Sequence, residues 1–343
     1  MKKTLSFLML LIVVLIAAAC GNDSNTGNES EASEGVITMK AGVGLNDQHP
    51  QYKALLKFKE EVEENSNGQM LVETYHSGQL GDDKQMIENV QLGSQEITIP
   101  STAPLANFVP EFNIFNFPFL FPNTEVADKV LDGEFGSNLL NKLEEASLVG
   151  LNYWEEGFYN ITNNVRPIES AEDLKGLKIR TMENQILLDV FKELGANPTP
   201  MAFGEVYSSL QQGVVDGQTN PPSQVYEAKF HETQEYMSET NDFYGVWVFL
   251  VNKEFYDGLN EEQQKIIKDA SIVARDFERQ ETRNSEQDYV EKLQEEGIKY
   301  NAVSPEALQE MKDIIQPVLD EYSKDFDKEM IDQLNKSLED AQS

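Results

Sequence analysis

The segment PTPMAFGEVYSSLQQGVVDGQTNPP, residues 198–222, is the stretch of sequence that decides the fold. The spacing of Tyr207, Leu210 and Val214 predicts one buried helical face, because steps of three and four residues return to the same side of a helix. The chain then continues into a short strand ending near Asn220, where two prolines turn the backbone. Ligands bind outside the carboxyl ends of strands in open α/β sheets, so this order of elements predicts a small-molecule site.

Strands and helices are expected to alternate on both sides of this segment. In the first half we expect strands at 37–42, 70–75 and 96–99 and helices at 52–65 and 82–92. In the second half we expect strands at 177–180 and 214–219 and helices at 185–194 and 205–212. In the first helix, Leu55, Leu56, Phe58 and Val62 are expected to face the core. Such alternation is typical of βαβ units in a largely parallel sheet.

A long helix is predicted over residues 260–296, a stretch without glycine or proline. Asn260 can cap its start, with Gln263 as the reciprocal capping partner. Its length of about 55 Å exceeds that of a small domain. About 300 residues follow the leader, which is more than one compact core usually holds, so two domains are expected with this helix lying across both. Ser304 and Pro305 are expected to begin a further helix.

The N-terminal 20 residues have the pattern of a targeting segment: two lysines, an apolar run over 5–16 and three alanines. The apolar run is shorter than the roughly 20 residues of a membrane-spanning helix. Cys20, the only cysteine of the chain, follows the alanines directly and cannot form an intramolecular disulfide. An ordinary signal peptide with a chance cysteine stays open as the alternative. Residues 21–35 are expected to be a disordered tether.

The formal net charge of −33 argues against nucleic-acid binding, which needs clustered lysines and arginines. The sequence also lacks the spacing of common enzyme motifs. Its three histidines, at 49, 76 and 231, are scattered, and there is no G-x-S-x-G, P-loop or G-x-G-x-x-G motif. We therefore predict no catalytic residue, no metal and no cofactor.

Arg180 is the first candidate for binding an anion, because only it and Arg166 precede residue 275 among the arginines. Strand alternation places Leu177 and Ile179 on one face and Arg180 on the other. The guanidinium group presents a planar fork of donors that matches the two oxygens of a carboxylate. From the residues alone, a surface ion pair is nevertheless the favoured role, with anion binding as the alternative.

The chain resembles the extracytoplasmic solute-binding proteins of tripartite ATP-independent periplasmic (TRAP) transporters, the DctP-type family, over roughly residues 36–325. Besides residues 198–222, the resemblance rests on YHSGQLGDDKQMIENVQLGSQEI (75–97), EDLKGLKIR (172–180) and NKEFYDGLNEEQQKIIKDA (252–270). It implies an α/β, two-lobed periplasmic-binding-protein-like (Venus flytrap) fold with a long helix spanning both lobes. The lobes are expected to comprise residues 36–157 plus 246–286 (lobe I) and 158–245 plus 287–335 (lobe II).

The resemblance also implies a function. A receptor of this kind captures an organic acid by lobe closure and delivers it to a membrane permease, without catalysis. Cys20 resembles the lipid-attachment cysteine of bacterial lipoproteins, which predicts a protein anchored to the outer face of the cytoplasmic membrane. Two alternatives stay open: a receptor that presents its ligand to a membrane sensor kinase, and a secreted enzyme on the same fold.

The resemblance assigns roles to individual residues. Arg180 corresponds to the clamp for the ligand carboxylate, Asn220 to an amide that contacts the same carboxylate or its neighbour, and Phe203 to an aromatic ring that covers the ligand. Read without the family, Asn220 is a turn residue before proline, and Phe203 belongs to the core. Further candidates for ligand contact lie in the loop after the first strand and near the crossings between the lobes: Asp47, His49, Ser101, Glu156 and Trp247.

Tyr159 departs from the family pattern, because many relatives carry a second arginine where this chain reads GFYNITNN. A tyrosine hydroxyl can form a hydrogen bond but brings no charge. Arg166 corresponds to a loop position and is not expected to take the place of that arginine. A monocarboxylate, such as a hydroxy, keto or sugar acid, is therefore expected to fit better than a dicarboxylate.

Overall fold

A computed structural model describes residues 35–343, and residues 36–343 form one compact unit. The expectations for the leader, for Cys20 and for most of the tether concern residues outside the described part. The first lobe opens with the expected alternation of strands and helices: β1 (Ile37–Gly42), α1 (Pro50–Asn65), β2 (Met70–Tyr75), α2 (Asp83–Gln91) and β3 (Ile97–Thr98). The three strands pair in parallel in the order β2-β1-β3. The expected inward face of α1 is wrong at Leu56, which is 41% exposed, because the buried stripe passes through Leu55, Phe58 and Val62.

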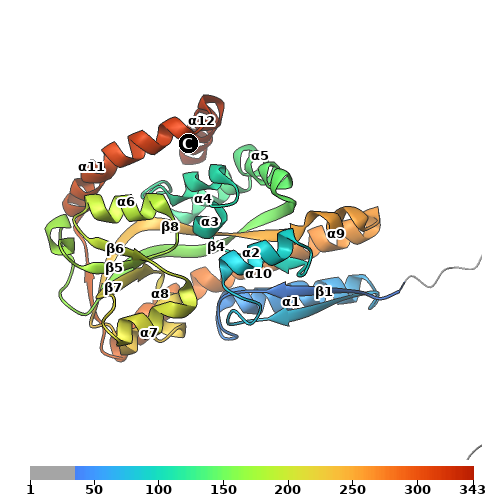
Figure 1. Cartoon of the computed structure of the whole chain (residues 1–343), viewed down its shortest axis with the longest axis horizontal. Coiled ribbons are helices and arrows are strands. Elements are labelled where there is room, and N and C mark those ends of the chain that lie inside the picture. The colour runs from blue at the N-terminus through green and yellow to red at the C-terminus, as the bar shows by residue number, and fades with distance from the viewer. Residues whose placement is uncertain (1–34) are drawn as a thin grey trace, which may run out of the picture. The chain divides into compact units, whose positions relative to one another are not determined.

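Two long strands join the lobes. β4 (Leu148–Asn163) and β8 (Tyr236–Asn252) run antiparallel through the middle of the sheet. The described strands form one sheet in the order β2-β1-β3-β8-β4-β7-β5-β6, with β9 (Lys299–Ala302) paired to β8. Figure 1 shows β4 and β8 crossing the molecule between the strands of the two lobes. Because β4 and β8 belong to both lobes, a hinge between the lobes has to bend these two strands.

The second lobe contains the segment that opened the sequence analysis. Its elements are β5 (Lys178–Thr181), α6 (Gln185–Glu193), β6 (Asn197–Pro200), α7 (Val206–Gln211), β7 (Gly217–Asn220) and α8 (Pro222–Glu227). The predicted helical face is wrong at Val214, which is 51% exposed. The helix ends at Gln211 and the backbone turns at Gly213 with a φ of +69°, so Val214 lies in a loop. Val215 is buried in its place.

Helix α10 (Glu261–Glu295) confirms the prediction of a long helix and is about 52 Å long. Asn260 and Gln263 form the expected capping box at its start. The helix packs against α1 of the first lobe, strand β4 and α8 of the second lobe. It therefore spans both lobes.

The remaining helices cover the sheet and the ends of the lobes. Helix α11 (Pro305–Tyr322) begins after Ser304, as expected. The other α-helices are α3 (Thr102–Leu105), α4 (Thr124–Leu131), α5 (Glu134–Asn141), α9 (Lys253–Gly258) and α12 (Lys328–Gln342). Short 3-10 turns occupy Pro110–Asn116, Lys142–Ala146, Ala171–Leu174, Phe203–Glu205, Phe230–Glu232 and Ser323–Asp325.

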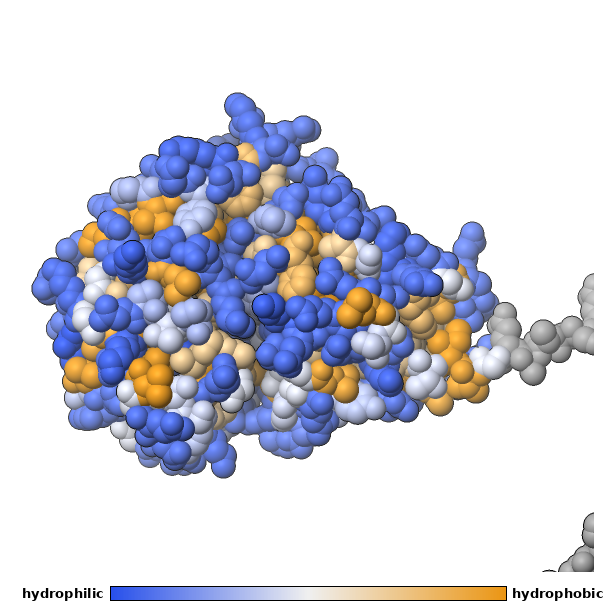
Figure 2. Space-filling model, viewed as in Figure 1, coloured by the Kyte–Doolittle hydropathy of each residue, from blue (hydrophilic) through white to orange (hydrophobic). Residues whose placement is uncertain are grey.

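Several apolar clusters make up the core. In the first lobe, Leu55, Phe58 and Trp154 pack with strands β1–β3 and α10, while Val206, Leu210 and other residues form a smaller core under α7 and α8. The largest cluster fills the opposite side of the sheet, beneath α4–α6, α11 and α12. Hydrophilic residues cover most of the face shown in Figure 2, in keeping with the acidic composition.

Candidate functional site

A cavity of about 640 Å³ lies between the two lobes, at the end of β7 and beside β5. Residues from both halves of the chain form its walls. They include Gly44, Leu45, Gln51, Asp82, Asp83, Lys84, Glu88, Ser101, Glu156, Arg180, Met182, Glu183, Met201, Phe203, Glu205, Asn220, Gln224 and Trp247. The volume suits a small organic molecule, and the position is the one expected for a ligand in a sheet of this type.

Arg180, at the end of β5, lies in the wall of this cavity with only 2% of its surface exposed. Its Nε and Nη2 atoms donate hydrogen bonds to the carbonyl oxygen of Met201, at 3.1 and 2.9 Å. Among the described residues, Nη1 has no hydrogen-bond partner. Burial lowers the pKa of Arg180 to about 10, against the opposing effect of nearby acidic groups, so the side chain stays cationic at neutral pH. The site thus contains a fixed cation with an unused donor.

Asn220 and Phe203, the other two residues with assigned roles, line the same cavity. Asn220 is buried at the tip of β7 and donates from Nδ2 to Oε1 of Gln218, which holds the amide in place. The Phe203 ring packs against Phe230 with ring centroids 5.5 Å apart. The fold therefore brings Arg180, Phe203 and Asn220 together, although α6, β6 and α7 lie between them along the chain.

An acidic pair faces the same space, with Glu156 buried and Asp83 partly exposed. The backbone nitrogen of Ser101 donates to Oδ2 of Asp83 at 3.0 Å, and its hydroxyl donates to Oε2 of Glu156 at 2.9 Å. Gln224 donates to the second Glu156 oxygen at 3.1 Å. Burial raises the pKa of Glu156 and, for Asp83, raises the pKa to about 7. Ser101 and Glu156 were candidates from the sequence, whereas Asp83 and Gln224 were missed.

Tyr159 is completely buried and does not line the cavity. Its ring packs against Phe243 at 4.9 Å, and its hydroxyl lies 3.7 Å from the Met182 sulfur. A register shift in β4 around Gly157 turns Glu156 toward the cavity and leaves Tyr159 behind Met182. The tyrosine therefore supports the wall instead of forming it.

Neither of the two candidates near the loop after β1 lines the cavity. Asp47 is exposed and lies outside the cavity wall. His49 is buried as the cap of α1: its Nδ1 accepts from the backbone of Gln51, and its Nε2 lies 3.2 Å from the Ser223 hydroxyl of the second lobe. Burial, with a smaller effect of Lys53, lowers the pKa of His49 to about 3, so this histidine is neutral.

Gln51 reaches the cavity in place of His49. Its amide nitrogen donates to the Ile99 carbonyl at 3.0 Å, and its buried Oε1 atom has no partner among the described residues. Trp247, a sequence candidate, also lines the cavity and packs edge-on against His49 at 5.7 Å. No spacing rule pointed to Gln51, because tertiary packing alone turns it inward.

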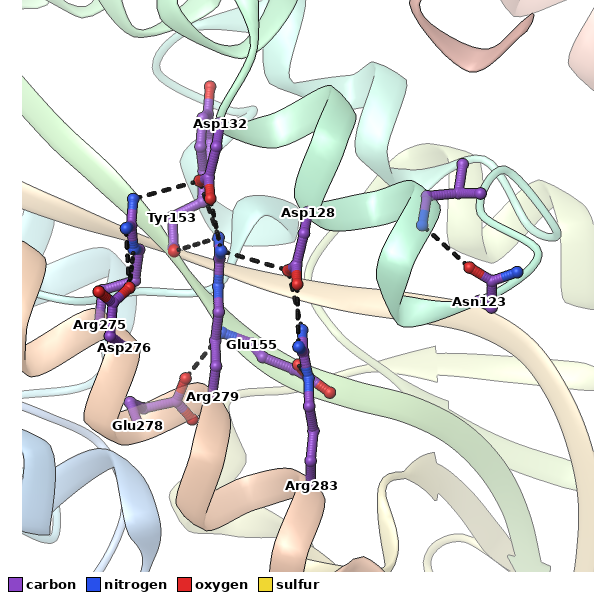
Figure 3. Close-up of polar contacts among 11 residues, drawn as sticks. Asn123, Asp128, Asp132, Tyr153, Glu155, Arg275, Asp276, Glu278, Arg279 and Arg283 are labelled. Carbon is purple, nitrogen blue, oxygen red and sulfur yellow. Dashed lines mark hydrogen bonds and ion pairs between the residues drawn. The ribbon is translucent and has the colours of Figure 1, made fainter. Parts of the chain in front are cut away.

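On the other side of β4, ion pairs tie the long helix to the helix α4 region. Arg279 pairs with Asp132, at 2.7 and 3.0 Å, and Arg283 pairs with Asp128, at 2.9 and 2.8 Å. Figure 3 shows these side chains as a ladder, with arginines projecting from α10 toward the aspartates. Each pair is bidentate, a geometry that fixes direction as well as distance.

The ladder continues into β4 next to the ligand cavity. Arg283 donates from Nε to Glu155 at 2.5 Å, and the Glu155 backbone nitrogen donates to Glu278 at 2.9 Å. Glu155 precedes Glu156, so one strand carries a cavity residue and a residue of the ladder at adjacent positions. The ladder fixes the part of β4 that positions the cavity wall.

The family model described as bacterial extracellular solute-binding protein, family 7 (DctP) matches residues 41–325. The chain belongs to this family. The match covers most of the chain, including every residue of the cavity wall. Members of the DctP family are substrate-binding receptors and not enzymes, so this protein is a solute receptor.

Individual relatives agree in sequence and in structure. The crystal structure of the sugar acid binding protein DctPAm from Advenella mimigardefordensis, in complex with galactonate, is 39% identical. The similarity covers 90% of this chain and 99% of that one, with a TM-score of 0.87. The 2,3-diketo-L-gulonate-binding periplasmic protein of Escherichia coli is 32% identical over 78% of this chain and 82% of its own. The C4-dicarboxylate-binding periplasmic protein DctP of Rhodobacter capsulatus is 33% identical over 82% and 85%.

DctP-family proteins act outside the cytoplasm, which agrees with the leader pattern. Within residues 35–343, no helix is both long and apolar enough to cross a membrane. The same residues contain no group of three or more histidine, cysteine or acidic side chains placed to bind a metal ion.

Proposed function

We propose that this DctP-family protein is the substrate-binding subunit of a TRAP-type transporter. It captures an organic acid by lobe closure and delivers the acid to the membrane permease. The observation that carries the proposal is the unpartnered Nη1 donor of Arg180, buried in the wall of a 640 Å³ cavity. A buried cationic donor without a partner is costly, and a ligand carboxylate satisfies it with a charge-assisted hydrogen bond.

The direction of the bound carboxylate follows from the contacts of Arg180. The Met201 carbonyl occupies the Nε side of the guanidinium group. The ligand therefore approaches from the Nη1 side, with Asn220 nearby as an amide donor or acceptor. Phe203 and Trp247 supply apolar surface for the carbon chain of the ligand.

The preferred ligand is a monocarboxylate with hydroxyl groups, such as a sugar acid. Lys84, an exposed residue, is the only other basic side chain in the described cavity wall. A second carboxylate would lie among acidic groups, where burial without a cation is expensive. Hydroxyl groups suit this wall, because Asp83, Glu156 and the Gln51 Oε1 atom accept hydrogen bonds. The galactonate complex of the Advenella relative supports this class, whereas the Rhodobacter relative makes C4-dicarboxylates the competing class.

Lobe closure takes place about β4 and β8 in this proposal. The moving parts are the two lobes expected from the sequence, residues 36–157 plus 246–286 and residues 158–245 plus 287–335. Two hydrogen bonds support a closed arrangement: Asn46 donates to the Glu227 carbonyl at 2.9 Å, and Asn107 donates to the Glu183 carbonyl at 2.8 Å. These bonds join loops of lobe I to lobe II.

Anchoring through Cys20 completes the proposal for the intact protein. A lipid on this cysteine would hold the receptor at the outer face of the membrane, with residues 21–35 as a tether to the permease. Membrane fractionation of cells expressing the wild-type protein and Cys20→Ala tests the anchor. The wild-type receptor is expected in the membrane fraction and the variant in the soluble one. An equal distribution of both would contradict lipid attachment.

A ligand screen by thermal unfolding tests the binding function. Ligand at a thousand times its Kd stabilises a receptor by about 4 kcal/mol, which gives a clear rise in Tm. D-galactonate and D-gluconate are expected to raise Tm more than succinate or malate. A larger rise in Tm with the dicarboxylates would contradict the proposed ligand class and assign C4-dicarboxylates as the ligands instead. Turnover of a bound acid by the purified protein would reject the receptor assignment.

A further inference from the structure

The charge of the cavity wall conflicts with the binding of an anion. Among the described wall residues, six acidic side chains stand against two basic ones: Asp82, Asp83, Glu88, Glu156, Glu183 and Glu205 against Lys84 and Arg180. A ligand carboxylate adds a further negative charge to this confined space. Like charges in a poorly solvated site favour the protonation of one of them. The binding of the ligand and the binding of a proton should therefore be linked.

The hydrogen bonds indicate which acid accepts that proton. Glu156 has donors on both oxygens, from the Ser101 hydroxyl at 2.9 Å and from Gln224 at 3.1 Å. Asp83 accepts a single hydrogen bond, from the Ser101 backbone nitrogen at 3.0 Å, and its other oxygen has no donor among the described residues. Donated hydrogen bonds stabilise the ionised form. Asp83 therefore has fewer hydrogen bonds that stabilise its ionised form than Glu156 has.

Arg180 does not neutralise either acid by direct contact. Its Nε and Nη2 atoms donate to the carbonyl of Met201 and not to a described carboxylate. The unpartnered Nη1 atom is thus an independent sign of an anion site beside the acidic wall. A carboxylate on Arg180 would weaken the favourable field that this cation exerts on the nearby acids.

We propose that Asp83 is a proton-binding site coupled to ligand capture: it takes up a proton when an organic acid binds Arg180. The proposal rests on the proposed function, since it needs a ligand carboxylate at Arg180. Once protonated, Asp83 has an O–H group that can donate a hydrogen bond into the cavity. The receptor then closes on the organic acid together with one proton.

The pH range follows from the surroundings of Asp83. Burial raises the pKa of Asp83 to about 7; Glu156 on β4 and Asp82 act in the same direction, while the Ser101 backbone and Arg180 oppose them. Lys84, Glu88, Glu183 and Glu205 also face the cavity. Without ligand, Asp83 is mostly ionised at pH 8 and mostly protonated at pH 6. A bound anion raises the pKa further, so proton uptake belongs to the range above pH 7.

Calorimetric titration of the full receptor with D-galactonate tests this linkage. Binding heats in phosphate and in Tris differ in proportion to the protons taken up, because the two buffers have different ionisation enthalpies. At pH 8 we expect an uptake approaching one proton, and at pH 6 an uptake near zero. The Kd should increase by close to tenfold per pH unit above pH 7. Equal heats in both buffers at pH 8 would overturn the proposal.

Asp83→Asn is the diagnostic variant, since an amide retains the acceptor for Ser101 and cannot take up a proton. It should bind D-galactonate without proton uptake and with the same affinity at pH 7 and 9. At pH 9 it should bind at least about tenfold more tightly than the wild-type protein. Glu193→Gln, at an exposed position outside the cavity, is the matched control and should retain the wild-type uptake. Unchanged proton uptake in Asp83→Asn would assign the proton elsewhere and overturn the proposal.

Failure of this inference is distinct from failure of the proposed function. If D-galactonate does not bind, the same titration is made with whichever carboxylate raises Tm in the ligand screen. If no carboxylate binds at any pH, the proposed function fails, and the proton site fails with it. Carboxylate binding that depends on Arg180 but exchanges no proton rejects the proton site alone.

Discussion

The role that we assign to Arg180 depends more on the contacts of its side chain than on its position in strand β5. A buried guanidinium group needs acceptors for its donors, and here Met201 supplies one carbonyl. Among the described residues Nη1 has no partner. In the proposed function, a ligand carboxylate supplies that partner. Arg166 lies outside the cavity wall, and its Nε and Nη2 atoms donate to the carbonyls of Asp173 and Lys175.

Arg180→Lys is expected to weaken ligand binding by roughly 10- to 150-fold, because a lysine retains the charge but loses the planar fork. Calorimetric titration with the best acid from the ligand screen measures this loss. Arg166→Lys is the matched control and should leave the Kd unchanged, since Arg166 lies outside the cavity wall. Normal binding by Arg180→Lys would show that the carboxylate is held elsewhere.

Glu278 on α10 is expected to make folding stability depend on pH. It is fully buried, and burial raises its pKa to about 8, compared with about 4.3 in an unfolded chain. Between these values the folded protein binds more protons than the unfolded one, so the contribution of Glu278 to stability declines as pH rises toward 8. Glu278→Gln removes this titration. The Tm of the variant minus that of the wild-type protein should therefore increase from pH 5 to pH 8. A difference in Tm that does not change with pH would contradict the prediction.

At the scale of elements, the ladder between α10 and the α4 region is a rigid connection behind the cavity. Four side chains form two bidentate pairs, and Arg283 extends the contact to Glu155 on β4. A long helix that touches both lobes needs a fixed attachment if the lobes are to move about β4 and β8. The ladder provides that attachment on the side of the sheet opposite the ligand.

Arg279→Ala is expected to cost about 3 kcal/mol of folding stability, the lower end for breaking a buried ion pair. The lower end applies because Asp128 and Asp132 are partly exposed and water can hydrate them. Urea unfolding measures the loss. Lys265→Ala, on the same helix but 74% exposed and paired only with Asp269, should cost less than about 0.5 kcal/mol. Similar losses in the two variants would show that the ladder adds no stability.

The sequence predicted some elements well because their signals are local. The capping box of Asn260 and the cap at Ser304 depend on residues three positions apart, and both helices begin where expected. Crossings between the lobes were expected near Glu156 and Trp247, but the bounds of the long strands β4 and β8 were not predicted, because both strands are largely buried on both faces and show no alternation. The prediction for Val214 was wrong because the three- and four-residue spacing of apolar residues continues in the sequence past Gly213, where the backbone turns after the end of the helix.

The candidate site was predictable only in part. Arg180, Asn220 and Phe203 were assigned through a family motif, and the fold places all three in one cavity. Asp83, Gln51 and Gln224 come from α2, α1 and α8, and only tertiary packing brings them together. Asp47 and Tyr159 were reasonable from their chain positions, but the first is exposed and the second lies behind Met182.

At the scale of the whole molecule, the net charge of −33 opposes the arrival of an anion. The field of exposed charges acts over distances that salt screens, with a Debye length of about 30 Å at 0.01 M and 8 Å at 0.15 M. The contact of the ligand with Arg180 is buried and is screened much less. Salt should therefore accelerate the approach of the ligand while leaving the bound contact nearly intact.

The association rate of D-galactonate, or of whichever acid binds best, is expected to increase severalfold between 0.01 and 0.15 M ionic strength. An anion attracted to a positive site would show the opposite trend. Stopped-flow tryptophan fluorescence can follow the reaction, because Trp247 lines the cavity and the only other tryptophan, Trp154, is buried in the first-lobe core. Choline chloride in place of sodium chloride controls for specific ion effects. A rate that falls with salt would mean that a local positive field around Arg180 outweighs the acidic surface.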